Sequence, residues 1–476
     1  MSNMIRLKKG LDIKLEGGAP YNLATLPLAD SYAIRPDDFK GFTPKLLVQP
    51  GDEVKAGSPL LFDKYRPEIL VASPVSGTVS AINRGEKRKI LEVVVTPDGL
   101  NESVEIEMPV VGLMNREAVL DAIQRAGLWP MLIQRPYGVI ADPAQRPKAI
   151  FVSGFDSSPL APNMDYVLSG QEANLSAGIE ALKKLTPGKV HLGLKAEGDS
   201  SLLGKTLNFL DRGKTTPKLD PNEPPRILQT VKGAEITYFD GPHPAGNVGV
   251  QIHQLDPINK GETVWTIDIQ NLAILGRFFR TGRVDMRKTI AITGTAVQNQ
   301  FYAKVIAGAS IKSTLKYNLP EDGSHFRIIS GNVLTGTKVE ENGYLTYYAN
   351  QITVIPEGDY YELVGWIMPR FKKFSVSKTY FSWLMPWKRY NLDTNLNGGH
   401  RAFIFNGIYD KYLPMDIYPV YLIKAVIAGD INKMENLGIY EVIEEDIALC
   451  EFIDPSKTEM QAILREGINQ MIKELN

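Results

Sequence analysis

Alternating apolar and polar positions dominate residues 41–96, and turn-forming pairs interrupt the alternation at short intervals. The run GFTPKLLVQPGDEVKAGSPLLFDKYRPEILVASPVSGTVSAI is broken at Pro-Gly, Ala-Gly and Ser-Gly, so it predicts short strands joined by tight turns. Its two halves are alike, since LVQPGDEV and VASPVSGTV each place a turn between β-branched or apolar residues. We therefore expect a small β-sandwich made of two similar hairpin units.

The apolar spacing becomes helical and then strand-like further along the chain. Residues 116–127 have a helical period and end on Gly127, a favourable residue just after a helix. KAIFVSGF, from residue 148, is a nearly continuous apolar strand, and KVHLGL, from residue 189, is a second. The helix between them has a start signal at Asn174 and a stop at Pro187-Gly188. Strand, helix and strand in this order predict a βαβ unit with a parallel sheet.

The remainder of the chain predicts a polar connection, a second mixed module and a helical tail. Residues 196–230 are rich in Gly, Pro, Lys and Asp and predict irregular structure, whereas 263–275 (TVWTIDIQNLAIL) is apolar enough to begin a helix. Between 288 and 335, glycine turns separate strands, and one short helix follows Ala309-Ser310, which indicates a small α+β module. From 415 onward the period is helical, so we expect a small helical bundle over about the last 60 residues.

Bulk composition excludes several classes of function. The chain has 476 residues, too many for one hydrophobic core, and predicts roughly three or four domains. Hydrophobic residues make up 43% and charged residues 22%, as in ordinary globular proteins, and the net charge of −1 gives no global attraction to nucleic acid. A single cysteine, Cys450, and five histidines without an HExxH pattern predict no disulfide, zinc site, iron–sulfur cluster or catalytic metal.

The sequence predicts no export signal and no membrane span. The N-terminus, MSNMIRLKKGLD, lacks the apolar segment of a signal peptide. No stretch approaches the run of about 18 apolar residues that a spanning helix needs. The best candidate, 415–428, is broken by Asp416, Pro419 and Lys424. We therefore expect a cytoplasmic protein, either free or docked on a membrane partner.

Lys64 is the first candidate for chemistry, because the strands around it resemble the biotinyl and lipoyl carrier fold. In such carriers an exposed hairpin lysine holds the swinging arm, and Phe62-Asp63-Lys64-Tyr65 partly matches their motif. Tyr65-Arg66-Pro67 replaces the small residues that follow the lysine in carriers, and the interval from Lys64 to Gly77 is longer. We expect an unmodified scaffold of the carrier type.

Nucleotide-binding motifs are incomplete. GKT at 204–206 and 213–215 lacks the upstream glycine of a phosphate-binding loop, because Asp199 and Asn208 stand there. The strand that begins at 148 is followed by Phe-Asp-Ser-Ser-Pro at 155–159, where a dinucleotide fold needs glycines for close approach of the pyrophosphate. Autonomous nucleotide binding is therefore not expected.

Three further candidates each have a structural alternative. Ser153 belongs to no GxSxG motif and is expected at a strand end, and Cys450 lies in the apolar run IALCEFI and is expected as a buried thiol. In FDGPHPAGNVGVQIH, the histidine between prolines, His243, is either part of a ligand site or part of a rigid loop. The loop alternative rests on backbone conformations that need glycine at Gly241, Gly246 and Gly249.

A basic and aromatic segment spans residues 363–392, with no acidic residue between Glu362 and Asp393. This composition suits a membrane–water interface, an interface with another protein, or single-stranded nucleic acid. A partly buried linker with solvated lysines is the structural alternative. We favour docking on a membrane subunit or on lipid headgroups, and expect no nucleic-acid partner. The candidate docking residues are Trp366, Arg370, Lys372, Lys373, Trp383, Trp387, Lys388 and Arg389.

Several short stretches carry a family resemblance. They are KKGLD at 8–12, RGEKR at 84–88, GLW at 127–129, KAIFVSGFDSSPLAP at 148–162, FDGPHPAG at 239–246, ISGNVLTGT at 329–337, GWIMP at 365–369, KFSVSKTY at 373–380 and EEDIALCEFIDPSK at 444–457. With them the chain resembles, over nearly its whole length, the A subunits of sodium-translocating NADH:quinone reductases. The module order also resembles the flavin subunit of respiratory complex I and the C subunit of Rnf complexes, whose glycine-rich flavin site and tail cysteines are missing here. Asp454 stands where relatives often keep a second cysteine.

The resemblance implies a subunit of a membrane respiratory complex that oxidises NADH, reduces quinone and exports sodium ions. It implies no catalytic residue, bound cofactor or metal in this chain, since NADH, flavins and iron are used by the rest of the complex. We expect five other subunits as partners, chiefly the large B subunit in the membrane. The expected location is peripheral, on the cytoplasmic side of the bacterial inner membrane.

The resemblance also brings two segments, 31–39 and 130–138, close to quinone. An arginine in either segment can donate hydrogen bonds to a quinone carbonyl and stabilise developing negative charge. The alternative is that both arginines brace contacts between domains. The candidate quinone-binding residues are Arg35, Pro36, Arg135, Pro136 and Tyr137.

Pattern and resemblance together predict a multidomain α/β protein. An independent flavin- or nucleotide-dependent reductase, and an assembly factor that leaves the mature complex, are the alternatives in other functional classes. The predicted parts are an N-terminal segment (1–40), a lipoyl/biotinyl-like barrel-sandwich domain (41–100), a connecting helix and linker (101–147), a Rossmann-like βαβ domain (148–257), a β-grasp-like domain of the soluble-ligand-binding type (258–362), and a basic aromatic linker with a C-terminal helical domain (363–476).

Overall fold

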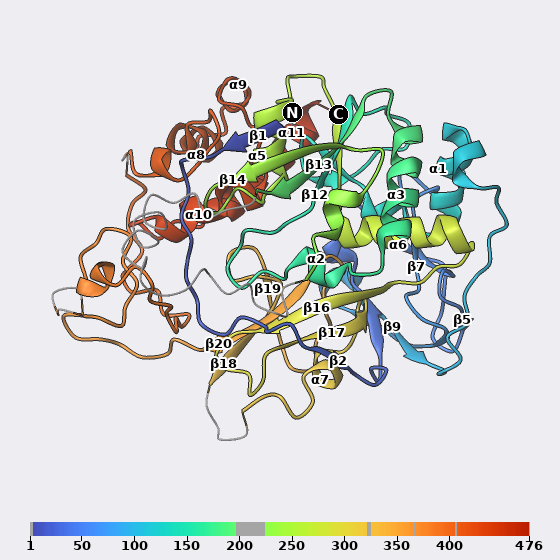
Figure 1. Cartoon of the computed structure of the whole chain (residues 1–476), viewed down its shortest axis with the longest axis horizontal. Coiled ribbons are helices and arrows are strands. Elements are labelled where there is room, and N and C mark those ends of the chain that lie inside the picture. Colours follow the sequence, from blue (N-terminus) through green and yellow to red (C-terminus); the bar gives the residue numbers. More distant parts are fainter. Residues whose placement is uncertain are drawn as a thin grey trace.

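The computed structural model of the chain places its strands in four sheets within the described residues, with a group of helices at the C-terminal end (Figure 1). Both GKT motifs and Trp366 lie outside the described residues. The structure describes residues 3–196, 224–320, 325–365, 368, 370–404 and 407–475.

The N-terminal half of the chain contains the predicted small sandwich, which is confirmed. In its longest pair, β8 and β9, the first four residues of β8 alternate between buried and exposed, whereas β9 buries three consecutive valines, Val93 to Val95. Val79 and Val95 face each other across the ladder inside the core. One sheet consists of β3 (Tyr32–Ile34), β9 (Ile90–Pro97), β8 (Gly77–Arg84) and β5 (Glu53–Val54). The other consists of β4 (Pro44–Leu46), β6 (Pro59–Asp63) and β7 (Leu70–Ala72).

The centre of the molecule is a sheet of seven strands, five of them parallel, and the predicted βαβ unit is confirmed within it. The strands are β1 (Asn3–Arg6), β14 (Glu235–Asp240), β13 (Lys189–Lys195), β12 (Ala149–Ser153), β15 (Val264–Asp268), β10 (Ile133–Arg135) and β11 (Val139–Ile140), in that order. The apolar run after 263 was predicted to begin a helix. It forms β15 first, because it fits between β12 and β10, and the helix starts only at Ile269 after Asp268 caps it. The predicted domain boundary at residue 258 therefore separates β15 from the other strands of its own sheet.

Helices cover both faces of the seven-stranded sheet. Ile150 and Val152 of β12 point toward α3 (Glu172–Leu185) and α6 (Ile269–Thr281), whereas Phe151 packs with Ile252 of α5 (Val248–Leu255). The predicted helix start at Asn174 is wrong, because α3 already begins at Glu172 and the Asn174 side chain instead accepts a hydrogen bond from Arg280. The helix predicted at 116–127 is confirmed as α1 (Arg116–Arg125), with Gly127 in a left-handed conformation after it.

The third module is a six-stranded sheet, which confirms the predicted α+β region. Its order is β19 (Thr337–Val339), β18 (Phe326–Ser330), β20 (Gln351–Pro356), β16 (Arg287–Thr293), β17 (Phe301–Ile306) and β2 (Leu23–Thr25), with the short helix α7 (Ile311–Thr314). Since β1, β2 and β3 each join a different sheet, the first 34 residues link three of the modules.

A buried lysine and a carboxylate meet where these modules join. Lys288 of β16 is 5% exposed and donates to Tyr347 O at 2.9 Å, while Asp38 accepts from Tyr347 N at 2.8 Å. Burial lowers the pKa of Lys288 to about 8 and raises the pKa of Asp38 to about 6. Both charges hold the same loop, so they fix the sandwich relative to the six-stranded sheet.

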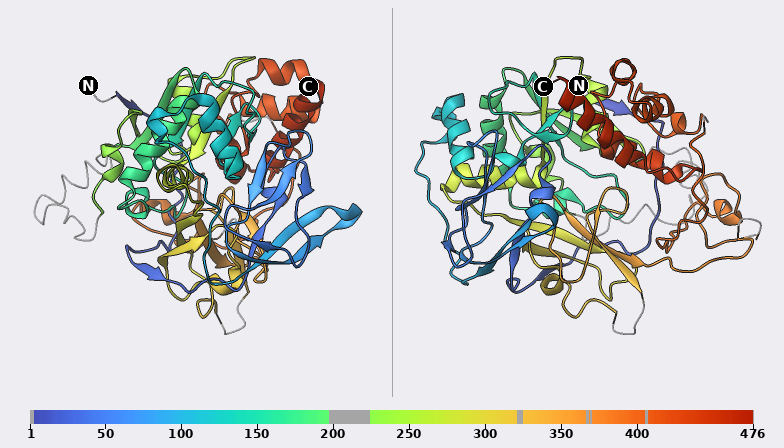
Figure 2. Two further views of the ribbon diagram at one scale, coloured as in Figure 1. Left: turned by 90° about the vertical axis from the view of Figure 1, so that its right-hand side faces the viewer. Right: turned by 180° about the vertical axis from the view of Figure 1, so that it is seen from behind.

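The C-terminal helices pack beside the seven-stranded sheet, with the six-stranded sheet at the other end of the molecule (Figure 2). Their core includes Phe239 of β14 and Val250 of α5, so the predicted helical bundle is confirmed but is not separate from the sheet. No helix in the described parts of the chain is both long and apolar enough to cross a membrane. The helices are α8 (Pro419–Ile427), α9 (Ile431–Asn436), α10 (Glu444–Ile453) and α11 (Met460–Leu475).

Candidate functional site

The order of strands in the seven-stranded sheet reverses between β12 and β15. From β12 the chain crosses through α3 to β13 and then β14 on one side, and later returns to place β15 on the other side of β12. Ligands of open α/β sheets bind at such a reversal, beyond the carboxyl ends of the strands. Ser153 and Asp268 are the last residues of the two strands and mark this place.

A cavity of about 310 Å³ lies at the reversal. That volume is at the lower end of the range for small-molecule sites, roughly 300–1,000 Å³. Polar groups from distant parts of the chain line it together with apolar side chains. Its polar lining includes Arg135, Ser158, His243, Asp268 and Glu445.

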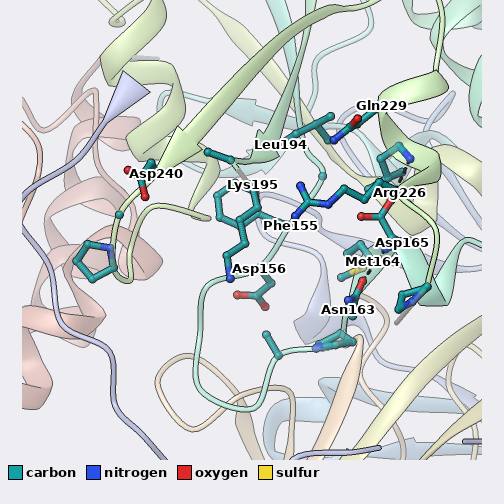
Figure 3. A pocket seen from close by; sticks show the side chains of 18 of the residues that line it. Phe155, Asp156, Asn163, Met164, Asp165, Leu194, Lys195, Arg226, Gln229 and Asp240 are labelled. Carbon is teal, nitrogen blue, oxygen red and sulfur yellow. Dashed lines mark hydrogen bonds between the residues drawn. The ribbon is translucent and has the colours of Figure 1, made fainter. Parts of the chain in front are cut away.

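A wider hollow of about 1230 Å³ continues along the same edge, past the ends of β12, β13 and β14 (Figure 3). It shares Phe155, Asp156 and Met164 with the smaller cavity. Lys195 at the end of β13 and Asp240 at the end of β14 border it, so its walls carry charges of both signs. The two hollows together form one continuous surface along the carboxyl edge of the sheet.

His243 is the most constrained polar group of the smaller cavity. The ring is 4% exposed, the His243–Pro244 peptide bond is cis, and Asp12 accepts from the backbone N–H of His243 at 2.9 Å. The Ser157 hydroxyl lies 3.0 Å from Nδ1, and Nε2 is buried without a hydrogen-bond partner among the described residues. Burial lowers the pKa of His243 to about 4, so the ring is neutral at physiological pH.

Ser158 and Asp156 lie in the loop that follows β12. The Asp156 carboxylate accepts from Ser158 N at 2.7 Å, and burial raises the pKa of Asp156. The Ser158 hydroxyl is near that carboxylate, but it is buried and makes no hydrogen bond of normal geometry in the described structure. Buried polar groups are rarely left unpaired. The Ser158 hydroxyl lies beside the Asp156 carboxylate, so His243 Nε2 is the less satisfied of these two groups.

Asp268 closes the other side of the cavity. Its carboxylate caps α6 by accepting from Gln270 N at 2.9 Å and Asn271 N at 3.2 Å, and Asn350 donates to it at 2.8 Å. Burial raises its pKa. Asp268 therefore fixes the end of β15 and the 347–350 loop, which the six-stranded module contributes to the cavity.

Arg135 lines the cavity but is already paired. Its side chain is 1% exposed, Nη1 donates to Asp446 at 2.6 Å, and Nη2 pairs with Glu445. These carboxylates belong to the first turn of α10. The two terminal nitrogens thus brace the C-terminal helices against β10. This is the arrangement expected if Arg135 braces a contact between domains.

The other candidate quinone residues have different settings. Pro136 is buried after a cis peptide bond, and Tyr137 has φ 83°, packs edge-to-face on Tyr440 and has its backbone carbonyl held by Arg465 at 2.8 Å. Arg35 is half-buried before the short 3-10 helix Pro36–Asp38, and its charge acts on Asp38. Of the two arginines, Arg135 alone lines the cavity.

The basic aromatic segment projects from one side of the molecule, at the left of Figure 1. Aromatic and aliphatic side chains on it are exposed, with Trp383 at 48% and Trp387 at 70%. The segment is fastened to the N-terminal chain, since Tyr390 N donates to Lys14 O at 2.8 Å and Glu16 N donates to Tyr390 O at 2.9 Å. The segment therefore combines exposed aromatic rings with a backbone attachment to the N-terminal chain.

Its basic residues divide into two groups. Arg370 and Lys373 pair with Glu362 at 3.1 and 2.8 Å, so their charges are partly neutralised. Lys388 donates to Phe371 O at 2.6 Å, and Arg389 donates to Leu15 O at 3.4 Å. Lys372 is exposed. Lys378 is also exposed, and its Nζ lies 5.8 Å from the centroid of the Trp383 ring. The positive charge that remains for a partner is therefore carried by Lys372, Lys378, Lys388 and Arg389.

The remaining sequence candidates lie apart from the cavity or have structural roles. Lys64 is exposed in the turn between β6 and β7, next to the buried Asp63–Arg66 ion pair. Ser153 is at the end of β12 as predicted, with its hydroxyl 2.8 Å from Gly246 O. Cys450 is confirmed as a buried thiol of α10, and burial raises its pKa to about 12. In the described ranges no group of three His, Cys, Asp or Glu side chains could hold a metal ion.

Comparison with known proteins identifies the family. The chain matches three family descriptions: the NqrA N-terminal barrel-sandwich hybrid domain over residues 5–98, the NqrA second alpha/beta domain over 114–211 and 213–284, and the NQRA C-terminal domain over 289–341. The A subunit of the Na(+)-translocating NADH-quinone reductase of Serratia proteamaculans is 35% identical over 478 residues, covering 99% of this chain and 100% of the relative. The protein of the same name from Rhodopirellula baltica is 34% identical and covers 99% of each chain.

Among solved structures, two chains of an NAD+-reducing [NiFe]-hydrogenase align more weakly. Their TM-scores are 0.33 and 0.35, at 15% and 13% sequence identity. The alignments cover 52% and 77% of this chain and 48% and 62% of those chains. Scores this low carry no argument about fold or function.

The family matches and the full-length relatives define the class: the chain is one component of an oxidoreductase complex. It belongs to the family of the A subunits of Na(+)-translocating NADH-quinone reductases, as the sequence resemblance predicts. The family descriptions also agree with the barrel-sandwich, α/β and C-terminal modules of the structure.

Proposed function

We propose that this chain is the peripheral, cytoplasmic-side subunit of a membrane complex that oxidises NADH, reduces quinone and exports sodium ions, and that its cavity at the strand reversal receives the quinone head group. The relatives that match over their full length are named for this activity. The partners are the other five subunits, chiefly the large B subunit in the membrane. Flavins and iron belong to those partners, and this chain holds no resident cofactor. The finer fold names, Rossmann-like and β-grasp-like, belong to the same proposal.

One observation carries the quinone proposal: His243 lines the cavity, and its Nε2 is buried and has no hydrogen-bond partner among the described residues. Where the Ser157 hydroxyl donates to Nδ1, the neutral ring keeps its proton on Nε2 and can donate it to a carbonyl oxygen. Ser158 supplies a second buried hydroxyl. A quinone carbonyl accepts hydrogen bonds and carries no charge, so it suits two neutral donors that burial keeps away from water.

Hydrogen bonds and ion pairs of the surrounding residues hold the walls of the cavity in place. Arg135 holds Glu445 and Asp446, and Asp268 holds the 347–350 loop through Asn350. Met131 and Ile133 supply apolar wall. In this arrangement Arg135 positions the walls, while Pro136 and Tyr137 set the course of the chain beside it. The expected role of Arg35 is separate, because Arg35 does not line the cavity.

The docking proposal rests on the exposed aromatic rings of the 363–392 segment. Trp383 and Trp387 place large apolar rings in solvent. Lys388 and Arg389 directly follow Trp387, and Lys378 Nζ lies 5.8 Å from the centroid of the Trp383 ring. Tryptophan and arginine are the residue types that contribute most to protein interfaces. We therefore infer that this segment meets the membrane partner, which leaves the strand-reversal cavity free for the head group.

Titration of a soluble short-chain quinone into the purified chain, followed by tryptophan fluorescence, tests the quinone proposal. We expect saturable binding that weakens at least about tenfold, or about 1.4 kcal/mol, in His243→Phe, with a smaller loss in Ser158→Ala. His400→Phe and Ser169→Ala change exposed residues away from the cavity and serve as matched controls. Arg35→Ala tests the second predicted segment in the same assay. A folded wild-type chain that binds no quinone, or equal binding by His243→Phe and His400→Phe, would disprove the proposal.

A further inference from the structure

Two neighbouring hollows lie away from the strand-reversal cavity and share the side chains of Arg287 and Lys304. One, of about 210 Å³, lies between α6 and the β16–β17 pair. The other, of about 230 Å³, lies beside β2 and α7. Neither hollow contains a residue of the carboxyl edge of the parallel sheet.

The strand register explains why positive charge collects here. Arg287 pairs with Ile306 and Thr289 pairs with Lys304 across the antiparallel ladder, so Arg287 and Lys304 project from one face of the sheet. Arg277 of α6 reaches the same place from the seven-stranded module. No Asp or Glu among the described residues lines either hollow.

Two carboxylates lie nearby. Asp285 balances the charge of Arg287, but neither carboxylate pairs with Lys304. Asp285 binds Arg287 through two oxygens, at 2.9 and 3.0 Å from Nε, and lies 3.5 Å from Arg277 Nε. Asp30 accepts from Ser313, which belongs to the wall of the second hollow, at 3.1 Å. The Lys304 side chain is exposed and has no hydrogen bond or ion pair within the described structure.

Arg277 shows the imbalance most directly. Its Nη2 donates to two backbone carbonyls, but Nε is buried without a hydrogen bond in the described part of the chain. Burial lowers the pKa of Arg277, and the nearby Arg287 lowers it further against the pull of Asp285. A partly buried cation with incomplete compensation is stabilised by an added anion.

The second hollow is apolar. Its walls include Leu26, Leu28, Tyr32, Val305 and Ile306, and the Leu28 side chain stands 50% exposed at its rim. An apolar hollow joined to a cationic one through the same two side chains fits a ligand with an apolar part and an anionic head. Burial of apolar surface in the hollow favours such binding, and the charges orient the ligand.

We propose that these hollows bind an amphipathic anion, with one acyl chain against Leu28 and Val305 and a carboxylate or phosphate head between Lys304, Arg277 and Arg287. A fatty acid and a single-chain phospholipid share this chemistry. The site joins the seven-stranded and six-stranded modules, so an occupant stabilises their contact. The proposal does not depend on quinone binding at the strand reversal.

Isothermal titration of the full chain with dodecyl phosphate and with dodecanoate, each below its micellar concentration, tests this site. Dodecanol and inorganic phosphate are the comparison ligands for the tail and the head alone. We expect both amphipathic anions to saturate and to bind at least about tenfold more tightly than either comparison ligand. The ratio of the two affinities then distinguishes a phosphate from a carboxylate head.

Variants separate the two halves of the site. Lys304→Ala and Leu28→Asn are each expected to weaken dodecyl phosphate binding by roughly tenfold, and Lys304→Arg to restore it. Lys312→Ala, on α7 and outside both hollows, is the matched control, and unchanged thermal unfolding checks the fold of each variant. Equal binding by Lys304→Ala and Lys312→Ala would overturn the proposal. So would dodecanol or inorganic phosphate binding as tightly as dodecyl phosphate.

Discussion

Arg135 and Asp446 lie 311 positions apart in the chain and form a buried ion pair, with 2.6 Å between Nη1 and Oδ2. Asp446 Oδ2 also accepts from Ile443 N at 2.9 Å at the start of α10. A Cβ at Gly249 would lie 2.2 Å from Asp446 Oδ1 and 2.4 Å from Arg135 Nη1. The pair therefore joins β10, α5 and α10 at one point, and glycine at 249 provides the room for it.

Removing one member of this pair should destabilise the protein strongly. Arg135→Ala leaves the Asp446 carboxylate, and in part Glu445, buried without a counter-charge, which costs about 3–5 kcal/mol. Urea unfolding followed by tryptophan fluorescence measures the change. Arg125→Ala, which breaks the exposed Arg125–Asp121 pair, is the matched control and should change the free energy of unfolding by less than about 0.5 kcal/mol.

The double variant Arg135→Met, Asp446→Leu separates the two explanations of a large loss. If charge imbalance is the cause, the double variant recovers most of the stability lost by Arg135→Ala, because the fully buried Asp446 charge is removed and only the partly exposed Glu445 loses its partner. A double variant as unstable as the single one would show that shape and hydrogen bonding at this point matter more than charge balance.

The sequence predicted the modules well because each carries a local signal. Period-2 alternation identified the sandwich, and KAIFVSGF identified β12, since buried parallel strands are continuously apolar. The helix start at Asn174 failed because asparagine is a common cap, while here its side chain serves a tertiary contact with Arg280. The sharing of β1, β2 and β3 among three sheets has no local signal at all.

The cavity could be predicted only in part. His243 between two prolines was a visible candidate, and the cis peptide bond and the buried ring give it a definite place. The loop that holds Ser158 was considered only for its lack of glycines. Glu445 lies in the resemblance stretch 444–457, but nothing in the sequence gave it a role at a site. Long-range pairs such as Arg135 with Asp446 depend on packing between distant segments, which one sequence does not reveal. Gly249 was predicted to serve backbone conformation, but the structure shows that its missing side chain matters.

The pH dependence of stability should report the buried His243 ring. Its pKa in the folded protein is about 4, against 6.5 when exposed, so the unfolded state binds more protons between these values. The stabilisation from the neutral ring is therefore complete above pH 6.5 and is lost as the pH falls toward 4. At pH 5 the loss is about 2 kcal/mol relative to pH 7.5.

Comparing wild type with His243→Asn in urea unfolding at pH 7.5 and pH 5 isolates this contribution. The variant should lose less stability than wild type over the same change in pH, because it has no ring to protonate. His400→Asn removes an exposed ring and should follow wild type. If His243→Asn and wild type lose the same free energy of unfolding between pH 7.5 and pH 5, groups other than His243 dominate acid destabilisation.

Asp454 should contribute strongly to the stability of the C-terminal helices. This residue is fully buried and accepts from Tyr409 OH at 2.8 Å, Ser456 N at 3.0 Å and Thr458 N at 2.8 Å. Burial opposes its charge, but these hydrogen bonds outweigh burial and lower its pKa. Asp454→Ala leaves three donors without their acceptor, so we expect a loss of about 3 kcal/mol.

Asp454, like His243, should stabilise the fold less as the pH falls, but for a different reason. Hydrogen bonds to the charged carboxylate lower the pKa of Asp454, whereas burial lowers the pKa of His243. A carboxyl group with a lowered pKa stabilises the fold above the unfolded value near 3.8, and that contribution disappears as the pH falls below it. The difference between wild type and Asp454→Ala should therefore be largest near pH 7 and shrink below pH 4. Asp121→Ala, at an exposed carboxylate, is the control. A difference that does not change with pH would mean that size rather than charge matters at this position.

A substitution in the docking segment, residues 363–392, should weaken binding to the membrane partner without changing the stability of the fold. Trp387 is 70% exposed, so Trp387→Ser removes apolar surface that is already in solvent and should change the free energy of unfolding by less than about 0.5 kcal/mol. A ring of this type at the centre of an interface contributes about 2 kcal/mol or more to binding, so its loss should weaken association with membranes that lack this chain by at least about thirtyfold. Leu100→Ser, at an equally exposed apolar residue on the sandwich module, is the matched control. Co-sedimentation of each variant with such membranes measures the effect. Equal sedimentation of Trp387→Ser and Leu100→Ser would move the interface away from this segment, whereas a selective loss in Trp387→Ser would locate the membrane partner beside it.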